Sequence, residues 1–91
     1  MEKRLSIPKV SIRQIKAGRA LLGWSQDDLA NKSNVSLPTI KRLEAAEDIL
    51  GGREDTINKI LNAMAEAGLS FIEENGGGAG VRITKRKKRF R

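Results

Sequence analysis

The chain has 91 residues, of which 38% are hydrophobic, enough for one small domain with a single core. It has neither cysteine nor histidine, which excludes disulfides, the usual zinc sites and the commonest general base, so we predict no metal and no cofactor. The formal net charge is +7, but the segment 85–91, KRKKRFR, holds six of the 18 basic residues, and the rest of the chain is almost neutral. No apolar run approaches the ~20 residues of a membrane span, so we predict no membrane partner.

The first predicted elements are an extended arm and a helix. Pro8 disfavours helical backbone at Ile7, so residues 1–10 are predicted to form an arm. Ser11 is a candidate N-cap, and Gly23 is a candidate end for the helix that follows. One face of this helix carries Ile12, Ile15, Arg19 and Leu22.

A second, short helix is predicted to begin after Ser25. Ser25 and Asp28 have the spacing of a capping box, and an acidic side chain suits the positive end of a helix. Leu29 and Ala30 are expected to point inward. Asn34 interrupts the pattern and is suited to a left-handed turn, so the second helix is expected to end there.

A third short helix follows, with Ser36 as its N-cap and Pro38 near its second position, where the missing N–H costs nothing. Ile40 and Leu43 form its inward stripe. The opposite face carries Pro38, Lys41, Arg42 and Ala45, spaced i, i+3, i+4 and i+7.

The last predicted elements are a longer helix and a hairpin. The helix covers residues 54–67, ends at Gly68, and has apolar residues at Ile57, Ile60, Leu61 and Met64. After Gly68 the period changes to two, and a glycine-rich loop, residues 75–80, separates two short runs. The predicted fold is mainly α, with about four helices and a C-terminal β-hairpin. It divides into an arm (1–10), a helical domain (11–68), a hairpin (69–84) and a basic tail (85–91).

Two short helices joined by a three- or four-residue turn are typical of a helix-turn-helix motif, whose second helix lies in the major groove of DNA. The stretch RALLGWSQDDLANKSNVSLPTIKRLEAAE, together with the helices around it from Ile12 to Leu69, resembles the phage-repressor and Cro family, the Xre-type helix-turn-helix proteins. The resemblance implies a lambda-repressor-like fold that binds double-stranded DNA.

The resemblance also implies which residues contact DNA. Ser25 and Gln26 match positions that touch the phosphate backbone. The positions that face the groove are Ser36, Leu37, Pro38, Thr39, Lys41 and Arg42. This sequence departs from the family at the turn, where Asn34 replaces the usual glycine, and at Leu37 and Pro38, where polar residues are usual. The loop AEDILGGR is also less basic than is common in the family.

Several residues have two interpretations. Lys41 and Arg42 either contact DNA or form an ordinary solvated face, and the motif favours DNA. Leu37 either contacts a thymine methyl or belongs to the core, and Trp24 is predicted to be core rather than a base-stacking platform. Arg19 and Glu44 lie on the apolar sides of their helices with opposite charge, which predicts a structural ion pair, since a buried charge needs a partner.

The predicted function is sequence-specific DNA binding by a cytoplasmic bacterial or phage regulator, acting as a repressor or autoregulator. An antitoxin-type regulator that also binds a toxin-like protein is the alternative, and an RNA-binding protein is a weaker one because aromatics are few. No enzyme is predicted: Glu73 and Glu74 are adjacent on a predicted strand and point to opposite faces.

We also predict a homodimer and a role for the basic tail. A lone two-stranded hairpin is marginally stable, so its apolar face is expected to form the dimer interface. That face carries Leu69, Phe71, Val81 and Ile83. The tail, Lys85 to Arg91, is either an auxiliary phosphate contact, whose deletion would flatten the salt dependence of binding, or a spectator.

Overall fold

The structure is a computed structural model and describes residues 10–46 and 53–84. Within these ranges the chain forms four helices and then a two-stranded antiparallel sheet, as the sequence predicts. The elements are α1 (Ile12–Leu22), α2 (Gln26–Ser33), α3 (Leu37–Ala45), α4 (Glu54–Glu66), β1 (Leu69–Ile72) and β2 (Gly80–Ile83). The predicted arm, apart from Val10, and the predicted basic tail lie outside the described residues.

The helix ends confirm the local signals in the sequence. Ser11 and Ser25 are the N-caps of α1 and α2, and each forms a capping box with the residue three positions on. Gly23 and Asn34 end these two helices in the left-handed conformation, with φ of 72° and 61°. The predicted end of α4 is one residue too late, because the helix stops at Glu66.

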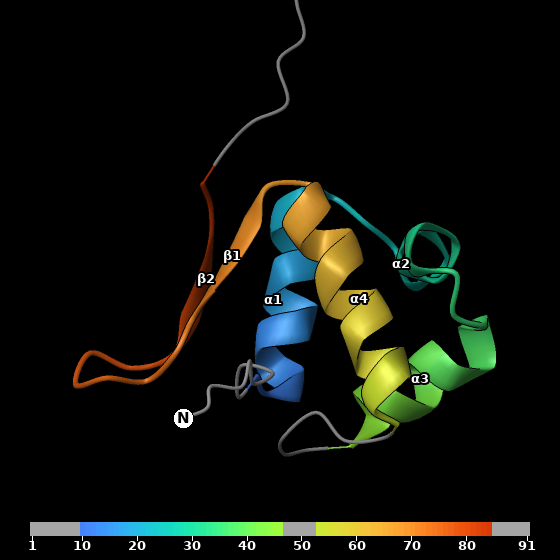
Figure 1. Ribbon diagram of the computed structural model, residues 1–91, viewed down its shortest axis with the longest axis horizontal. Helices are drawn as coiled ribbons and strands as arrows, with labels where there is room; N and C mark the ends of the chain where they lie inside the picture. Colours follow the sequence, from blue (N-terminus) through green and yellow to red (C-terminus); the bar gives the residue numbers. More distant parts are fainter. Residues whose placement is uncertain (1–9, 47–52, 85–91) are drawn as a thin grey trace, which may run out of the picture.

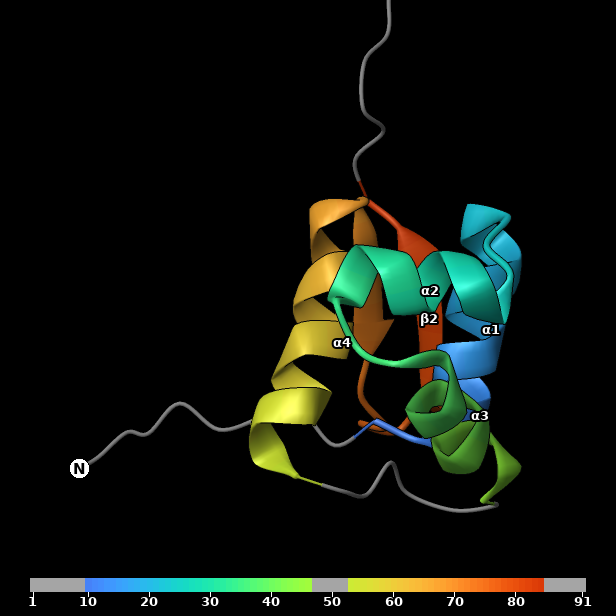
Figure 2. The ribbon, with the colours of Figure 1, turned by 90° about the vertical axis from the view of Figure 1, so that its right-hand side faces the viewer.

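The elements form three layers (Figure 1). The α1 and α4 helices lie in the middle, the hairpin lies along one side of them, and α2 and α3 lie on the other. In the view turned by 90°, α2 and α3 lie in front of α1 and α4, and the strands lie behind them (Figure 2). The exposed side of α3 is therefore on the opposite side of the domain from the hairpin.

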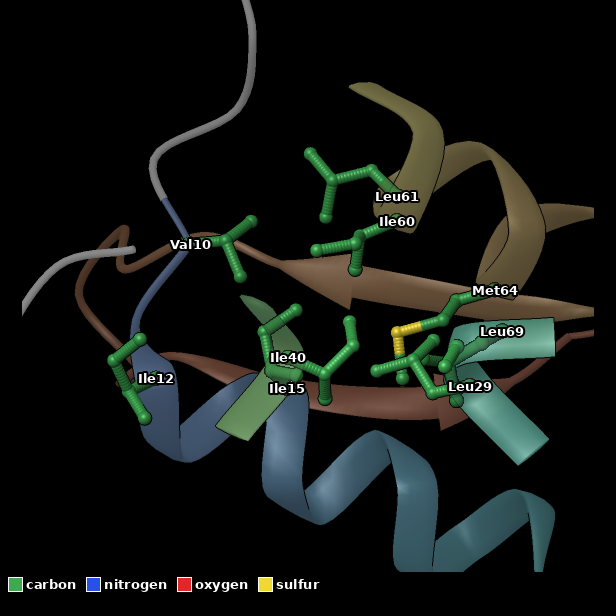
Figure 3. Packing of buried hydrophobic residues seen from close by; sticks show 10 residues of the cluster. Val10, Ile12, Ile15, Leu29, Ile40, Ile60, Leu61, Met64 and Leu69 are labelled. Atoms are coloured by element: carbon green, nitrogen blue, oxygen red, sulfur yellow. The ribbon is translucent and has the colours of Figure 1, made fainter. Parts of the chain in front are cut away.

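One apolar core fills the space between these layers (Figure 3). Its fully buried side chains include Ile15 of α1, Leu29 of α2, Ile40 of α3 and Met64 of α4, each no more than 1% exposed. Every helix thus contributes an inward side chain, which explains why helices as short as α2 and α3 are stable here: tertiary packing rather than propensity holds them.

The hairpin packs on its own domain. Leu69 is 3% exposed and belongs to the core, and Phe71 and Val81, paired across the two strands, pack against it. Only Ile83 of the predicted interface residues is exposed. The domain's own core therefore covers most of the apolar face that the sequence predicts for a second subunit.

A buried amide also ties the hairpin to α1. Gln14 Nε2 donates hydrogen bonds to the carbonyl oxygens of Ile72 (3.1 Å) and Gly80 (2.9 Å), near the loop end of the hairpin. Gln14 Oε1 accepts from the backbone N–H of Ser11 at 2.9 Å and so completes the capping box of α1. One side chain therefore begins α1 and docks the hairpin on it.

Candidate nucleic-acid interface

The turn between α2 and α3 fixes the relative position of the two helices. Asn34 adopts the left-handed conformation, and the next N–H, of Val35, donates to the carbonyl of Ala30 at 3.1 Å. Ser36 then caps α3, its Oγ accepting from the N–H of Thr39 at 3.3 Å and donating to Thr39 Oγ1 at 2.9 Å. Asparagine tolerates this backbone because its short polar side chain permits the left-handed region, so the absence of the usual glycine does not prevent the turn.

The α3 helix presents a cationic outer face. Pro38, Lys41, Arg42 and Ala45 are all exposed. On the inner side, Ile40 and Glu44 are 1% and 4% exposed. Leu37 is half-buried and packs against the core, which favours the core interpretation of this residue over the thymine contact. The cations Lys41 and Arg42 are thus the long polar side chains that α3 directs outward.

The start of α2 carries the two predicted phosphate contacts. The exposed Ser25 accepts from the N–H of Asp28 at 3.0 Å through its Oγ, while Asp28 Oδ2 accepts from the N–H of Ser25 at 2.9 Å. The Ser25 hydroxyl hydrogen is still available to a phosphate oxygen. Gln26 is half-buried, and its Nε2 donates to Glu44 Oε1 at 3.0 Å.

The structure brings Arg19 and Glu44 together. Arg19 Nε and Nη2 donate to the two carboxylate oxygens of Glu44, both at 2.8 Å, and Arg19 Nη1 donates to the carbonyl oxygen of Trp24 at 3.0 Å. Burial alone would raise the pKa of Glu44, but hydrogen bonds from Arg19 and Gln26 outweigh it and hold that pKa below its ordinary value. The hydrogen bond to Glu44 raises the pKa of Arg19. The network therefore joins α1, the α1–α2 connection, α2 and α3.

Sequence reasoning did not select Arg53, which lies close to this surface. A hollow of about 360 Å³ separates α3 from the start of α4 and is lined by Thr39, Arg42, Leu43, Arg53, Asp55 and Thr56. Arg53 is the N-cap of α4 and is largely exposed, with a weak surface contact of 3.5 Å to Asp55. The only sequence signal for it is that it is the one basic residue in AEDILGGR.

Trp24 lies away from the cationic face and forms no stacking platform. Its half-buried ring packs against the core, with Lys32 Nζ 5.7 Å from the ring centroid. In the described part of the chain, no three potential metal ligands of the His, Cys, Asp or Glu type lie together. Nor does any helix there have the length and apolarity needed to span a membrane.

Comparison with known proteins agrees with this geometry. The family model described as helix-turn-helix, HTH_3, matches residues 15–64, which is more than half of the chain. The matched region includes all of α2 and α3 together with most of α1 and α4. A comparison with curated proteins finds no match.

Proposed function

From the premise that the chain belongs to the Xre- and Cro-type helix-turn-helix family, we propose that it is a sequence-specific transcriptional repressor or autoregulator. Membership of this family, which is a non-enzymatic one, implies DNA binding. The observation that carries the proposal is the outward projection of Lys41 and Arg42 from a helix whose other side is anchored in the core by Ile40.

In the proposed complex, α3 lies in the major groove. The planar guanidinium group of Arg42 suits a bidentate contact with O6 and N7 of guanine, which discriminates against other bases by about 1–3 kcal/mol. Lys41 either makes a similar contact or neutralises a phosphate. Pro38, which has no N–H, and the small Ala45 flank the two cations and let the helix approach the groove closely.

The remaining polar groups would fix the register on the phosphates without reading sequence. Ser25 and Gln26 offer donors at the start of α2, and Thr39, whose Oγ1 accepts from Ser36, offers its own hydroxyl hydrogen in the first turn of α3. Arg53 adds an exposed cation beside the hollow that it shares with Arg42. These contacts would come from three separate helix starts, so together they would orient α3 in the groove.

A dimer is part of the proposal, because one short helix contacts too few base pairs for useful specificity, and two half-sites about 34 Å apart double the contact. The proposed dimer contact is backbone pairing along an edge strand of the hairpin, not the burial of an uncovered apolar face. Among the described residues, the backbone hydrogen bonds outside the helices and the β1–β2 ladder include none to residues 69–72 or 80–83. Pairing along such an edge leaves α3 free, because α3 lies across the domain from the hairpin (Figure 1).

Repression is the simplest regulatory outcome. A protein bound to a promoter excludes other proteins from the same DNA by occupancy alone, whereas activation also requires a favourable contact with the transcription machinery. Binding to its own promoter would make the chain an autoregulator. Transcription from a promoter that carries the selected DNA site, measured with and without the protein, tests this part of the proposal.

The experiment for DNA binding is to select bound duplexes from a random pool and then titrate the preferred site. Arg42→Ala should weaken binding and relax preference at one base pair per half-site, whereas Lys41→Ala should either do the same elsewhere or weaken all sequences about equally. Lys32→Ala is the matched control, because it removes an exposed cation that lies beside Trp24, away from the cationic face of α3 and outside the hairpin. If the folded Lys41→Ala/Arg42→Ala protein binds with unchanged affinity and preference, α3 does not read DNA and the proposal fails.

A further inference from the structure

The Glu44 carboxylate is shared by three helices. It projects from α3 and is buried, and Arg19 of α1 occupies both of its oxygens with hydrogen bonds of 2.8 Å. Gln26 of α2 adds a third donor, Nε2, 3.0 Å from Oε1. The ion pair between Arg19 and Glu44 is thus already bidentate without Gln26, so the amide is not needed to complete it.

The carboxylate dictates which way round the Gln26 amide lies. An ionised carboxylate only accepts hydrogen bonds, so the amide atom that faces Glu44 must be the NH₂ nitrogen and not the carbonyl oxygen. The carbonyl oxygen Oε1 therefore points away from Glu44. One of the two Nε2 hydrogens is used at Glu44, and the described hydrogen bonds leave the second one available. The orientation follows from charge and is not an arbitrary choice between two similar amide rotamers.

We propose that Glu44 is a positioning residue for DNA binding, which holds the Gln26 amide in one orientation so that its second N–H can donate to a phosphate oxygen. The inference rests on the proposed function. It gives Glu44 a role beyond stability. Because Glu44 belongs to α3, the same side chain anchors the helix proposed to enter the groove and sets the direction of the Gln26 donor. A preoriented donor binds better because less rotamer entropy is lost on binding.

A double-mutant cycle on DNA affinity separates positioning from simple stability. Gln26→Ala is measured on the selected duplex in the wild-type background and in an Arg19→Met/Glu44→Leu background. Replacing both members of a buried ion pair by apolar residues commonly preserves or increases stability, so the second background is expected to stay folded. We expect Gln26→Ala to weaken binding about tenfold in the wild type, as expected for one lost charge-assisted hydrogen bond, but less than about threefold in the second background.

Two results of the cycle overturn the proposal. An equal loss in both backgrounds means that Gln26 contacts DNA without help from Glu44. No loss in either background means that Gln26 does not contact DNA and serves only as an extra donor to the carboxylate. Asn31→Ala is the control, because it removes an exposed amide side chain from the same helix and should leave the affinity unchanged.

A second measurement does not depend on any variant folding. In the free wild-type protein, ¹⁵N relaxation should give the Gln26 side-chain amide a clearly higher order parameter than the exposed side-chain amide of Asn31. A Gln26 amide as mobile as that of Asn31 overturns the proposal. If instead the amide is rigid but no duplex is selected from the random pool, the proposed function has failed and not the orientation by Glu44.

Discussion

At the scale of single residues, Gly18 sets how closely α1 approaches the hairpin. A Cβ at this position would lie 2.6 Å from Leu69 Cδ2 and 2.9 Å from Met64 Cε. Both side chains are buried, at 3% and 0% exposure, so neither has free space to move into. Glycine here is therefore a packing requirement rather than a helix-breaking defect.

Gly18→Ala is accordingly expected to destabilise the protein by about 1–3 kcal/mol, the usual cost of overpacking a core. Helix propensity alone predicts the opposite sign, a gain of about 0.5–1 kcal/mol. Chemical denaturation of the wild type and the variant measures the difference. Gly77→Ala is the control, because a Cβ at Gly77 would meet nothing within 4 Å, and its stability should stay within about 0.5 kcal/mol of the wild type. A gain in stability for Gly18→Ala would show that the Leu69 and Met64 side chains can move aside.

A second prediction at this scale concerns how the Glu44 carboxyl makes stability depend on pH. Its pKa is lower in the folded protein than the ordinary value of about 4.3, so it stabilises the fold above that pH, and this contribution is lost as the pH falls through the folded pKa. Glu44→Gln should therefore reduce stability at neutral pH by about 1–3 kcal/mol, and the difference from wild type should shrink below about pH 4.3. Urea denaturation from pH 7 to pH 3 measures both. A difference that does not change with pH would mean that Glu44 is not the titrating group.

The sequence predicts the role of a single residue well where a charged side chain interrupts the apolar face of a helix. Arg19 and Glu44 stand out because each places a charge on an apolar face, and the structure brings them together. Gln14 and Gly18 give no such signal. A glutamine in the first turn of a helix is unremarkable in a sequence, and its bonds to Ile72 and Gly80 span 58 and 66 residues. Only the packed fold reveals that both residues are needed by the hairpin.

At the scale of elements, the sequence predicts type and order well because each boundary has a local cause. Ser11, Ser25 and Ser36 cap helices through their own hydroxyls, and Asn34 turns the chain through its own backbone preference. The packing partner of the hairpin is a non-local property. Period-two alternation identifies an apolar face, but it does not say whether the cover comes from the same chain or from another. The alternation therefore could not show that the cover of Leu69 comes from the domain's own core.

Gln14 gives a testable prediction about how the hairpin is held. Gln14→Glu keeps an oxygen that can cap α1, but it places a carboxylate against the carbonyl oxygens of Ile72 and Gly80. We expect a loss of about 1–3 kcal/mol, since two half-buried carbonyl oxygens lose the Gln14 donor and face a carboxylate instead. Native-state hydrogen exchange should show that amides in β1 and β2 lose more protection than those in α2 and α3.

The control for this prediction is Ser11→Ala, which removes the capping hydroxyl and leaves the Gln14 bonds to the hairpin in place. It should cost about 1 kcal/mol without selective loss of protection in the strands. If Gln14→Glu lowers protection evenly over the domain, the amide supports the whole fold rather than docking the hairpin.

At the scale of the whole molecule, the three layers separate two tasks. The α2 and α3 helices lie on one side of α1 and α4, and the hairpin lies on the other (Figure 2). A surface for DNA and a surface for a second subunit can therefore coexist without competing. The hairpin adds little exposed apolar surface beyond Ile83, so any dimer through it must depend mainly on backbone pairing.

The dimer proposal is best tested at a strand edge. Ending the chain at Gly68 would also remove Leu69 from the core, so loss of the dimer would be confused with loss of the fold. Ile83→Pro is cleaner. Thr84 N–H donates to Gly68 O, and ladder bonds alternate along antiparallel strands, so the N–H of Ile83 faces away from β1. Proline there removes an edge donor and no ladder bond.

We expect the wild-type chain to be dimeric by light scattering and Ile83→Pro to shift the equilibrium towards monomer, with little change in circular dichroism. Ile83→Ala is the control: it removes the exposed apolar side chain and keeps the N–H, so it should remain largely dimeric if backbone pairing dominates. DNA binding should follow assembly, because a monomer engages one half-site, and Ile83→Pro should therefore lose affinity for a full site while retaining its weak affinity for an isolated half-site. A folded Ile83→Pro protein that dimerises as tightly as the wild type would place the interface elsewhere on the domain.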